Sequence, residues 1–332
     1  MILAIDGGST KTISVVFDEK NNEIISSGLA GSANYSTNPV ERSMDNLKKS
    51  IREALKNGNT SMDRIDRAIV SIVGIGDSEE ATLIGRRILS DVLGSMKYDA
   101  VNDGLAAYQL GNGNMDGIAF APGTGSVGHY RYGEEMNRFG GWGWSIGDMS
   151  SATWFSKKSI ERAMFEIDSE TVDRPFKNML EKHFGMDTRE FAWKIETRKM
   201  PKEVLASFSR RLSLMAADGD PYAISLYEES GEYMGKIVEG IGKKIGAGKR
   251  VSIMGGTMQA GDFYHKIIRK HIPDANIFYG YEIVVGALMG DQQNFEFSFR
   301  DELLSQLARS MEKMPVKDLK EYLNIEKPLS RP

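Results

Sequence analysis

Two short glycine-rich segments lie about half a chain apart, and each interrupts an apolar run with a turn of small residues. The first is Asp6-Gly7-Gly8-Ser9-Thr10-Lys11-Thr12 and the second is Gly123-Thr124-Gly125-Ser126. Glycines let the backbone approach an anion and turn successive N–H groups towards it, while Ser and Thr add hydroxyl donors. Two such turns in one chain predict a clamp on a polyphosphate.

Each glycine-rich turn is followed by more strand. Ile13, Val15 and Phe17 alternate with other residues after the first turn, and His129-Tyr130-Arg131-Tyr132 continues after the second. The pattern predicts two β-hairpins whose tips face a ligand. It differs from a P-loop and from a dinucleotide-binding loop, because both of those open a helix. Two ordinary hairpin turns are the alternative.

Strands alternate with helices along the 332 residues, which predicts an α/β chain of two domains. The two halves run through the same order of elements, and the second starts near Asp116, which indicates an internal duplication. Two such domains would enclose a ligand-binding cleft. Helical periodicity appears over residues 40–55 and 205–215. The predicted strands cover residues 2–5, 13–17, 24–26, 68–73, 100–101, 117–121, 251–254 and 275–278.

Composition excludes several classes of function. The net charge of -4 gives no reason to expect a nucleic acid or a membrane as partner. No apolar stretch approaches the roughly 20 residues of a membrane span and the chain opens on a strand, so we expect a cytoplasmic protein. With 0 cysteines there are no thiolate metal sites, and the 4 histidines lack zinc-like spacing. The sequence does not decide the oligomeric state, and a homodimer is compatible with it.

Three further segments carry candidate functional residues. Asp103 follows the predicted strand 100–101, where its carboxylate could accept a proton from an attacking hydroxyl, although Asn102-Asp103-Gly104 is also a good plain turn. The loop from Gly140 to Asp148 holds Trp142 and Trp144, which suit the floor of a sugar site unless they are buried structural residues. The strand 251–254 runs into Gly255-Gly256, which permits close backbone approach to a base or ribose, or forms an ordinary turn.

Taken in the order in which they occur along the chain, these motifs resemble the series of motifs found in the N-acetylglucosamine kinase and BadF-BadG-BcrA-BcrD-type ATPase family. That family belongs to the actin, sugar-kinase and heat-shock ATPase superfamily. The resemblance covers nearly the whole chain and implies two ribonuclease H-like domains around an interdomain cleft. It implies a discontinuous sugar-side domain, residues 1–108 with 283–332, and an ATP-side domain, residues 109–282.

The resemblance also implies roles for individual residues. Asp6 would hold Mg²⁺ through water, and Asp103 would be the catalytic base. Asn34, Trp142, Trp144 and Asp148 would bind the sugar, with Asn34 equally readable as a loop or cap residue. The ATP-binding residues would be Gly7, Gly8, Ser9, Thr10, Lys11, Thr12, Gly123, Thr124, Gly125, Ser126, Gly255 and Gly256.

Two departures from the family pattern bear on the substrate. Members that phosphorylate N-acetylglucosamine commonly have Asn and Glu where this chain has Val127 and Met149. Because both changes remove polar groups, we expect a different acceptor, with 2-keto-3-deoxygluconate as first candidate and N-acetylglucosamine or another N-acetylhexosamine as the alternative.

Two other classes of function compete with a kinase. A redox activator of this family would need cysteines for its iron–sulfur cluster, and the chain has 0. A non-catalytic actin-like module that binds ATP and assembles is the remaining alternative.

Overall fold

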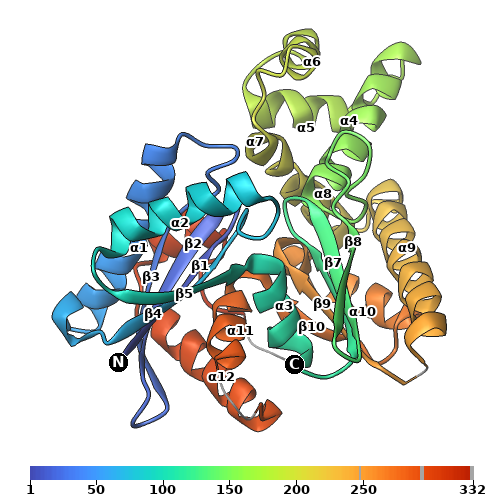
Figure 1. The fold of residues 1–332 in the computed structure, drawn as a ribbon. Coiled ribbons are helices and arrows are strands. Elements are labelled where there is room, and N and C mark those ends of the chain that lie inside the picture. Colours follow the sequence, from blue (N-terminus) through green and yellow to red (C-terminus); the bar gives the residue numbers. More distant parts are fainter. Residues whose placement is uncertain (247, 292–294, 330–332) are drawn as a thin grey trace. The chain divides into compact units, whose positions relative to one another are not determined.

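The core of the structure consists of two five-stranded sheets with the same pattern of strands (Figure 1). This computed structural model describes residues 1–246, 248–291 and 295–329. The first sheet has the order β3-β2-β1-β4-β5, and the second, read from its other edge, has the order β8-β7-β6-β9-β10. In each sheet three consecutive strands pair antiparallel, and two later strands join in parallel. The shared order shows the repeated architecture from which the sequence analysis inferred an internal duplication.

The strands are β1 (Ile2–Gly7), β2 (Lys11–Asp18), β3 (Glu23–Gly31), β4 (Arg67–Ile72), β5 (Lys97–Asn102), β6 (Gly117–Pro122), β7 (Ser126–Tyr132), β8 (Glu135–Gly140), β9 (Arg250–Gly255) and β10 (Asn276–Tyr279). The α-helices are α1 (Val40–Asn57), α2 (Glu79–Leu93), α3 (Asp103–Asn112), α4 (Ala152–Asp168), α5 (Pro175–Phe184), α6 (Thr188–Glu196), α7 (Lys202–Ala206), α8 (Ser209–Ala217), α9 (Pro221–Ile245), α10 (Asp262–His271), α11 (Ile283–Gly290), α12 (Phe297–Glu312) and α13 (Val316–Asp318).

The chain divides into two compact units. Unit 1 consists of Met1–Met115 with Tyr281–Pro332, of which residues 292–294 and 330–332 lie outside the described part, and unit 2 is Asp116–Gly280. A boundary after residue 108, as expected from the sequence, would cut through α3. That helix stays with unit 1 because it packs along α11.

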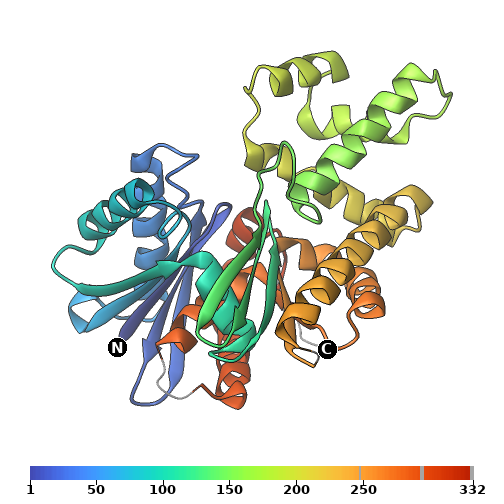
Figure 2. The same cartoon turned by 45° about the vertical axis from the view of Figure 1, so that its right-hand side comes forward.

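In unit 1 the helices cover both faces of the sheet (Figure 2). Leu3 and Ile5 of β1 are fully buried in a core that also contains apolar residues of α1 and α2. Since side chains alternate along a strand, the other face of β1 is free to pack on α11. The contact between α11 and α3 is very close, because a Cβ at Gly286 would lie 2.0 Å from the carbonyl oxygen of Ala106.

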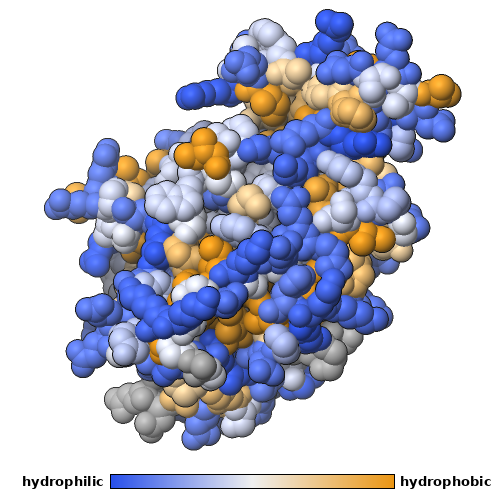
Figure 3. Space-filling view, turned by 90° about the vertical axis from the view of Figure 1, so that its right-hand side faces the viewer, coloured by the Kyte–Doolittle hydropathy of each residue, from blue (hydrophilic) through white to orange (hydrophobic). Residues whose placement is uncertain are grey.

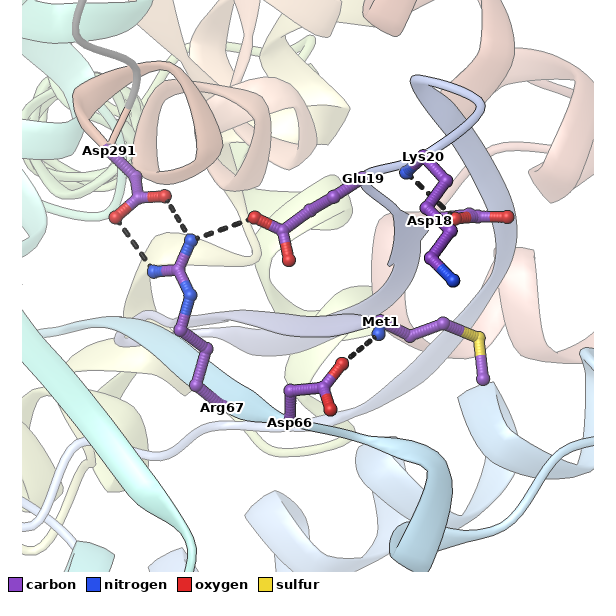
Figure 4. Close-up of polar contacts among 7 residues, drawn as sticks. All are labelled: Met1, Asp18, Glu19, Lys20, Asp66, Arg67 and Asp291. Atoms are coloured by element: carbon purple, nitrogen blue, oxygen red, sulfur yellow. Dashed lines mark hydrogen bonds and ion pairs between the residues drawn. The ribbon is translucent and has the colours of Figure 1, made fainter.

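An ion-pair network holds the end of α11 to the sheet (Figure 4). Arg67, the first residue of β4, donates from Nη1 to Asp291 at 2.8 Å and from Nη2 to Glu19 at 3.1 Å. A second bond from Nη2 to Asp291 makes the pair bidentate, the geometry in which Arg–carboxylate pairs are strongest. These bonds raise the pKa of Arg67 above its ordinary value.

Unit 2 carries a helical segment, α4 to α8, between β8 and the long helix α9 (Figure 1). The periodicity over residues 205–215 suggested one helix, but α7 ends at Ala206 and α8 begins at Ser209. Apolar residues on the surface of this segment are interspersed with hydrophilic ones (Figure 3). The exposed large ones are Phe165, Val172, Trp193, Val204 and Leu214. None of the described helices has the length and apolar character needed to cross a bilayer.

The close contact at Gly286 makes a stability prediction. Gly286→Ala should lower the free energy of unfolding by about 1–3 kcal/mol, because the new methyl group must push α11 away from α3. Gly240→Ala in α9 is the matched control: nothing lies within 4 Å of its Cβ position, so the change should be neutral or stabilising by up to about 1 kcal/mol. Urea unfolding followed by circular dichroism measures both, and equal effects would contradict the packing argument.

Candidate functional site

The carboxyl ends of the parallel strands in unit 1 lie in register along one edge of the sheet. Gly7 of β1 pairs with Ile72 of β4, and Ile72 pairs with Asn102 of β5. Asp6 and Asp103 therefore lie at the same edge. In open α/β sheets this is the edge at which ligands bind.

The first glycine turn is held tightly at this edge. Gly8 N donates to Lys11 O at 2.9 Å, and Gly8 O accepts from Ala33 N at 3.1 Å. A Cβ at Gly7 would lie 3.1 Å from both Ala33 Cβ and Ile72 Cγ1, so a larger residue would force these neighbours apart. The structure thus forms the hairpin that the sequence predicted, with its tip at the ligand edge.

Asp6 is a buried carboxylate beneath this turn, with 3% of its surface exposed. Its Oδ1 accepts a hydrogen bond from Ser71 Oγ at 2.6 Å. Burial raises the pKa of Asp6, and the Ser71 bond and the charge of Lys11 oppose this in part. Burial likewise lowers the pKa of Lys11, against the attraction of Asp6.

Asn34 lies against the first turn. Its Nδ2 donates to Ser9 Oγ at 3.1 Å, and its Oδ1 accepts from Ser36 N at 2.9 Å. The side chain is 7% exposed and partly used in local loop contacts, so the interpretation as a loop residue has support from the structure. Its proximity to Ser9 places it beside the candidate phosphate turn, and its role in sugar binding stays a prediction.

Asp103 is the first residue of α3 and is half-buried. Asn102 caps this helix by accepting from Gly104 N at 2.9 Å, and Asp103 Oδ1 accepts from the same N–H at 3.0 Å. Burial, helped by the charges of Asp6 and Asp77, raises the pKa of Asp103 to about 7. A carboxyl group with this pKa can change protonation state near neutral pH, which general acid–base catalysis requires.

Asp77 is a member of this cluster that the sequence analysis did not identify. It lies in the loop after β4, where its Oδ1 accepts from Asn102 Nδ2 at 3.4 Å. Together with burial, Asp77 and Asp103 also raise the pKa of the nearby Tyr35 to about 12. The signal was available, because Gly74-Ile75-Gly76-Asp77 is a glycine-rich end of a strand followed by a carboxylate.

In unit 2 the second glycine turn is braced by hydrogen bonds to its carbonyl oxygens. A carbonyl directed at an anion would repel it, so engaging these oxygens with protein donors favours an anion site. Two of the donors belong to the first turn of α4, whose N-terminus contributes positive potential. The bonds run from Thr257 Oγ1 to Pro122 O at 2.6 Å, from Ala152 N to Gly123 O at 2.9 Å, from Thr153 Oγ1 to Thr124 O at 3.0 Å, and from Gly141 N to Ser126 O at 2.8 Å.

The end of β9 packs directly on this turn. Gly255 has φ of +139°, and a Cβ there would lie 2.4 Å from Pro122 O, so the chain requires glycine for this contact. Apart from its two chain neighbours, no described residue has an atom within 4 Å of the Cβ position of Gly256. The structure therefore gives Gly255 a packing reason of its own, and the contact of Gly255-Gly256 with adenosine stays a prediction.

The glycine-rich loop after β8 presents one of its two tryptophans to solvent. Trp142 is 75% exposed, so its interpretation as a buried structural residue is wrong, while Trp144 is half-buried. Lys157 of α4 donates to the carbonyl oxygens of Trp144 and Ser145 at 3.0 and 3.1 Å and fixes the loop. Asp148 is 6% exposed, and its Oδ1 accepts from Gly143 N at 3.2 Å.

A lysine that the sequence analysis missed also lies at the second turn. Lys202 Nζ is 3.6 Å from Asp148 Oδ2. A Cβ at Gly125 would meet this same pair, 2.6 Å from Asp148 Oδ2 and 2.8 Å from Lys202 Nζ. No sequence pattern links Lys202 to residues 123–126, because only the path of the helical segment brings it there.

A comparison with known protein families decides the family of this chain. A model of the BadF/BadG/BcrA/BcrD ATPase family matches residues 3–290. The chain belongs to this family. The match includes both glycine turns, Asp103 and the loop to Asp148, as the resemblance of the motifs predicted.

Individual relatives of this BadF-type ATPase are distant in sequence. The N-acetyl-D-glucosamine kinase of Dictyostelium discoideum is 21% identical over 297 residues, which are 83% of this chain and 92% of the relative. A crystal structure assigned as an N-acetylglucosamine kinase from Chromobacterium violaceum has a TM-score of 0.69 at 18% identity, covering 88% of this chain and 98% of that one.

A glucokinase of the ROK family from Streptomyces griseus has a TM-score of 0.56 at 16% identity, with 87% of this chain and 97% of that chain covered. At these identities the likeness concerns the fold. It confirms the fold class expected for the ATPase, two ribonuclease H-like α/β domains.

The carboxylate cluster of Asp6, Asp77 and Asp103 in unit 1 leads to a prediction about titration. In metal-free protein Asp103 should titrate near pH 7, because burial, and after it the charges of Asp6 and Asp77, disfavour the ionised form. Asp77→Asn removes one of these charges and should lower the pKa of Asp103. Carboxyl ¹³C NMR across pH 4–9 measures both.

The same shift fixes how stability should depend on pH. Between pH 4 and 7 the native state holds a proton on Asp103 that the unfolded chain has released. As the pH rises from 4 to 7, the free energy of unfolding of the wild type should therefore decrease relative to that of Asp103→Asn. A pKa of Asp103 near 4, or one that Asp77→Asn does not change, would contradict the claim that the surroundings of Asp103 raise its pKa.

Proposed function

We propose that the protein is an ATP- and Mg²⁺-dependent sugar kinase that transfers the γ-phosphate to a hydroxyl of a sugar or sugar acid. The observation that carries the proposal is the place of Asp103 at the ligand edge of unit 1, in register with the first glycine turn, where burial raises its pKa to about 7. Family membership and the names of the relatives support it, because the Dictyostelium relative is an N-acetyl-D-glucosamine kinase. The Streptomyces glucokinase was crystallised with glucose and AMPPNP.

Asp103 acts as general base in this proposal. Its deprotonated form accepts the proton of the sugar hydroxyl while that oxygen bonds to the γ-phosphorus, and the bond from the γ-phosphorus to the β,γ-bridging oxygen breaks. Asn102 keeps the carboxylate in place by capping α3 and by donating to Ile75 O at 2.7 Å. Asn34 is assigned to sugar binding from the same unit.

The residues of unit 1 fit magnesium held through water. Among the described residues, no group of three or more His, Asp or Glu side chains is arranged to ligate a metal ion. Mg²⁺ commonly keeps several waters and uses one or two carboxylates with substrate phosphates, so a single buried carboxylate such as Asp6 suffices. When bound, Mg²⁺ neutralises phosphate charge. Ser71 orients Asp6 for this role, and Lys11 adds positive charge at the turn.

The residues of unit 2 fit the nucleotide. Buried Ser126 Oγ has no hydrogen-bond partner among the described residues, which leaves a donor for a phosphate oxygen. We assign phosphate binding to the second turn, as to residues 7–12 in unit 1, and adenosine contact to Gly255-Gly256. Trp142, Trp144 and Asp148 are assigned to the sugar.

For the acceptor we propose a sugar acid first, with 2-keto-3-deoxygluconate as leading candidate. Val127 and Met149 are half-buried beside the second turn and Asp148, and neither can hydrogen-bond an N-acetylhexosamine as Asn or Glu could. N-acetylglucosamine remains the second candidate, because two of the relatives are assigned to that sugar.

The roles of the two aspartates separate in a kinetic test. Asp103→Asn should lower kcat by about 10²–10⁴, the range of general base catalysis, and leave ATP binding intact. Asp6→Asn should instead weaken use of Mg²⁺–ATP by about 10–100-fold, because an oriented group around the metal is lost. Initial rates and titration calorimetry measure these effects. The control is Asp99→Asn, an exposed change on the same strand as Asn102, which should keep wild-type rates. Near wild-type turnover by Asp103→Asn would show that the 102–104 turn is structural.

A panel of acceptors tests the substrate. Purified protein with Mg²⁺–ATP should phosphorylate 2-keto-3-deoxygluconate with a higher kcat/KM than gluconate, N-acetylglucosamine, N-acetylmannosamine or glucose. A clear preference for N-acetylglucosamine would overturn the assignment of a sugar acid as the acceptor. It would still support the proposed kinase activity. ATP binding with no turnover on any sugar, together with concentration-dependent filaments, would overturn the kinase and favour an assembly module.

A further inference from the structure

Lys202 and Asp148 form an ion pair that differs from the other lysine pairs of unit 2. Asp148 is nearly buried, with 4% of its side chain exposed, while 26% of the Lys202 side chain is exposed. On the surface of α9, by contrast, Lys236 and Glu232 are 72% and 55% exposed, as expected of a pair with little energetic effect. The backbone of Asp148 has φ of +53°, an uncommon conformation for a residue other than glycine. The burial of Asp148 distinguishes this pair from a solvated surface contact.

The ammonium group of this pair lies directly against the second glycine turn. A methyl group on Gly125 would lie 2.8 Å from Lys202 Nζ, so the absence of a side chain at 125 is what lets the ammonium approach the backbone. The neighbouring Ser126 Oγ is buried and has no hydrogen-bond partner among the residues that the structure describes. The N-terminus of α4 adds positive potential at the same place.

Lys202 has donors beyond those that Asp148 requires. An ammonium group carries three N–H donors, and at 3.6 Å the contact with Asp148 is a loose ion pair rather than a short hydrogen bond. Asp148 is held independently by Gly143 N–H at 3.2 Å.

We propose that Lys202 binds an oxyanion of the ligand at the 123–126 turn and that Asp148 positions it there. The inference deepens the proposed kinase function and rests on it for the identity of the ligand. The oxyanion belongs either to a nucleotide phosphate or to the carboxylate of a sugar-acid acceptor. Both present negatively charged oxygens of the kind that an ammonium group and a hydroxyl recognise together.

Binding measurements on Lys202→Met distinguish the two sources. If the oxyanion is a phosphate, the variant should bind Mg²⁺–ATP about 10–100-fold more weakly, the loss expected for one charged hydrogen bond, and should bind adenosine as the wild type does. If it is a carboxylate, the KM for the keto sugar acid should rise by a similar factor, and the KM for N-acetylglucosamine should not change. Lys202→Arg keeps the charge and should stay within about threefold of the wild type.

The controls keep the test decisive. Lys236→Met removes a lysine from a surface pair of the same unit and should change none of these values. Thermal melting reports whether each variant folds. If Lys202→Met does not fold, Lys202→Gln removes the charge and keeps a polar side chain.

Unchanged binding of ATP and of the sugar acid by a folded uncharged variant would overturn the proposal while leaving the kinase in place. If ATP binding depends on Lys202 but the protein phosphorylates no sugar, the result would support the anion-binding role of Lys202. It would contradict the proposed kinase activity.

Discussion

Burial of a carboxyl group at one edge of the first sheet, beside two other carboxylates, is the constraint on which the chemistry of unit 1 depends. The in-register ends of β1 and β5 bring Asp6 and Asp103 to this edge, and Asp77 follows β4. Negative charges gathered in a partly dehydrated place favour the protonated form of one of them, and here that is Asp103. Burial and, after it, this repulsion give the proposed base a pKa suited to neutral pH, and the gathered carboxylates give a cation a reason to bind.

The duplicated topology gives the second unit an equivalent edge with different side chains. Where unit 1 has Asp6 and Asp103 at the ends of parallel strands, unit 2 has a glycine turn after β6 and Gly255 as the last residue of β9. The carbonyl oxygens of that turn are engaged by protein donors, and a lysine lies beside it. In the proposed kinase, unit 1 therefore supplies the base and the carboxylate for the cation, and the glycine turns of both units bind phosphate. Phosphoryl transfer needs both sets of groups.

A feature could be predicted from the sequence where neighbouring residues in the chain mark it. Asp6, Asp103 and both turns follow strands, and the end of a buried strand is visible in the pattern of apolar residues. Strand β8 was missed because Glu135–Gly140 contains few apolar residues and is largely exposed. The break between α7 and α8 was missed because residues 207 and 208 keep near-helical backbone angles, so the apolar periodicity runs through it. Lys202 was missed because its position depends on tertiary packing, which leaves no mark on the spacing of residues.

The helical segment of unit 2 occupies the place in the duplicated topology that α1 occupies in unit 1, the connection from the third strand to the fourth. In unit 1 this connection holds one long helix, whereas in unit 2 it runs from α4 to α9. The added helices supply Lys157, which fixes the tryptophan loop, and Lys202, which reaches the glycine turn. We propose that these added helices adjust ligand binding at the second glycine turn and the tryptophan loop, while the proposed base depends on the strand ends of unit 1. A substitution of Lys157 in α4 or Lys202 in α7 would then change ligand binding in unit 2 without touching the proposed base.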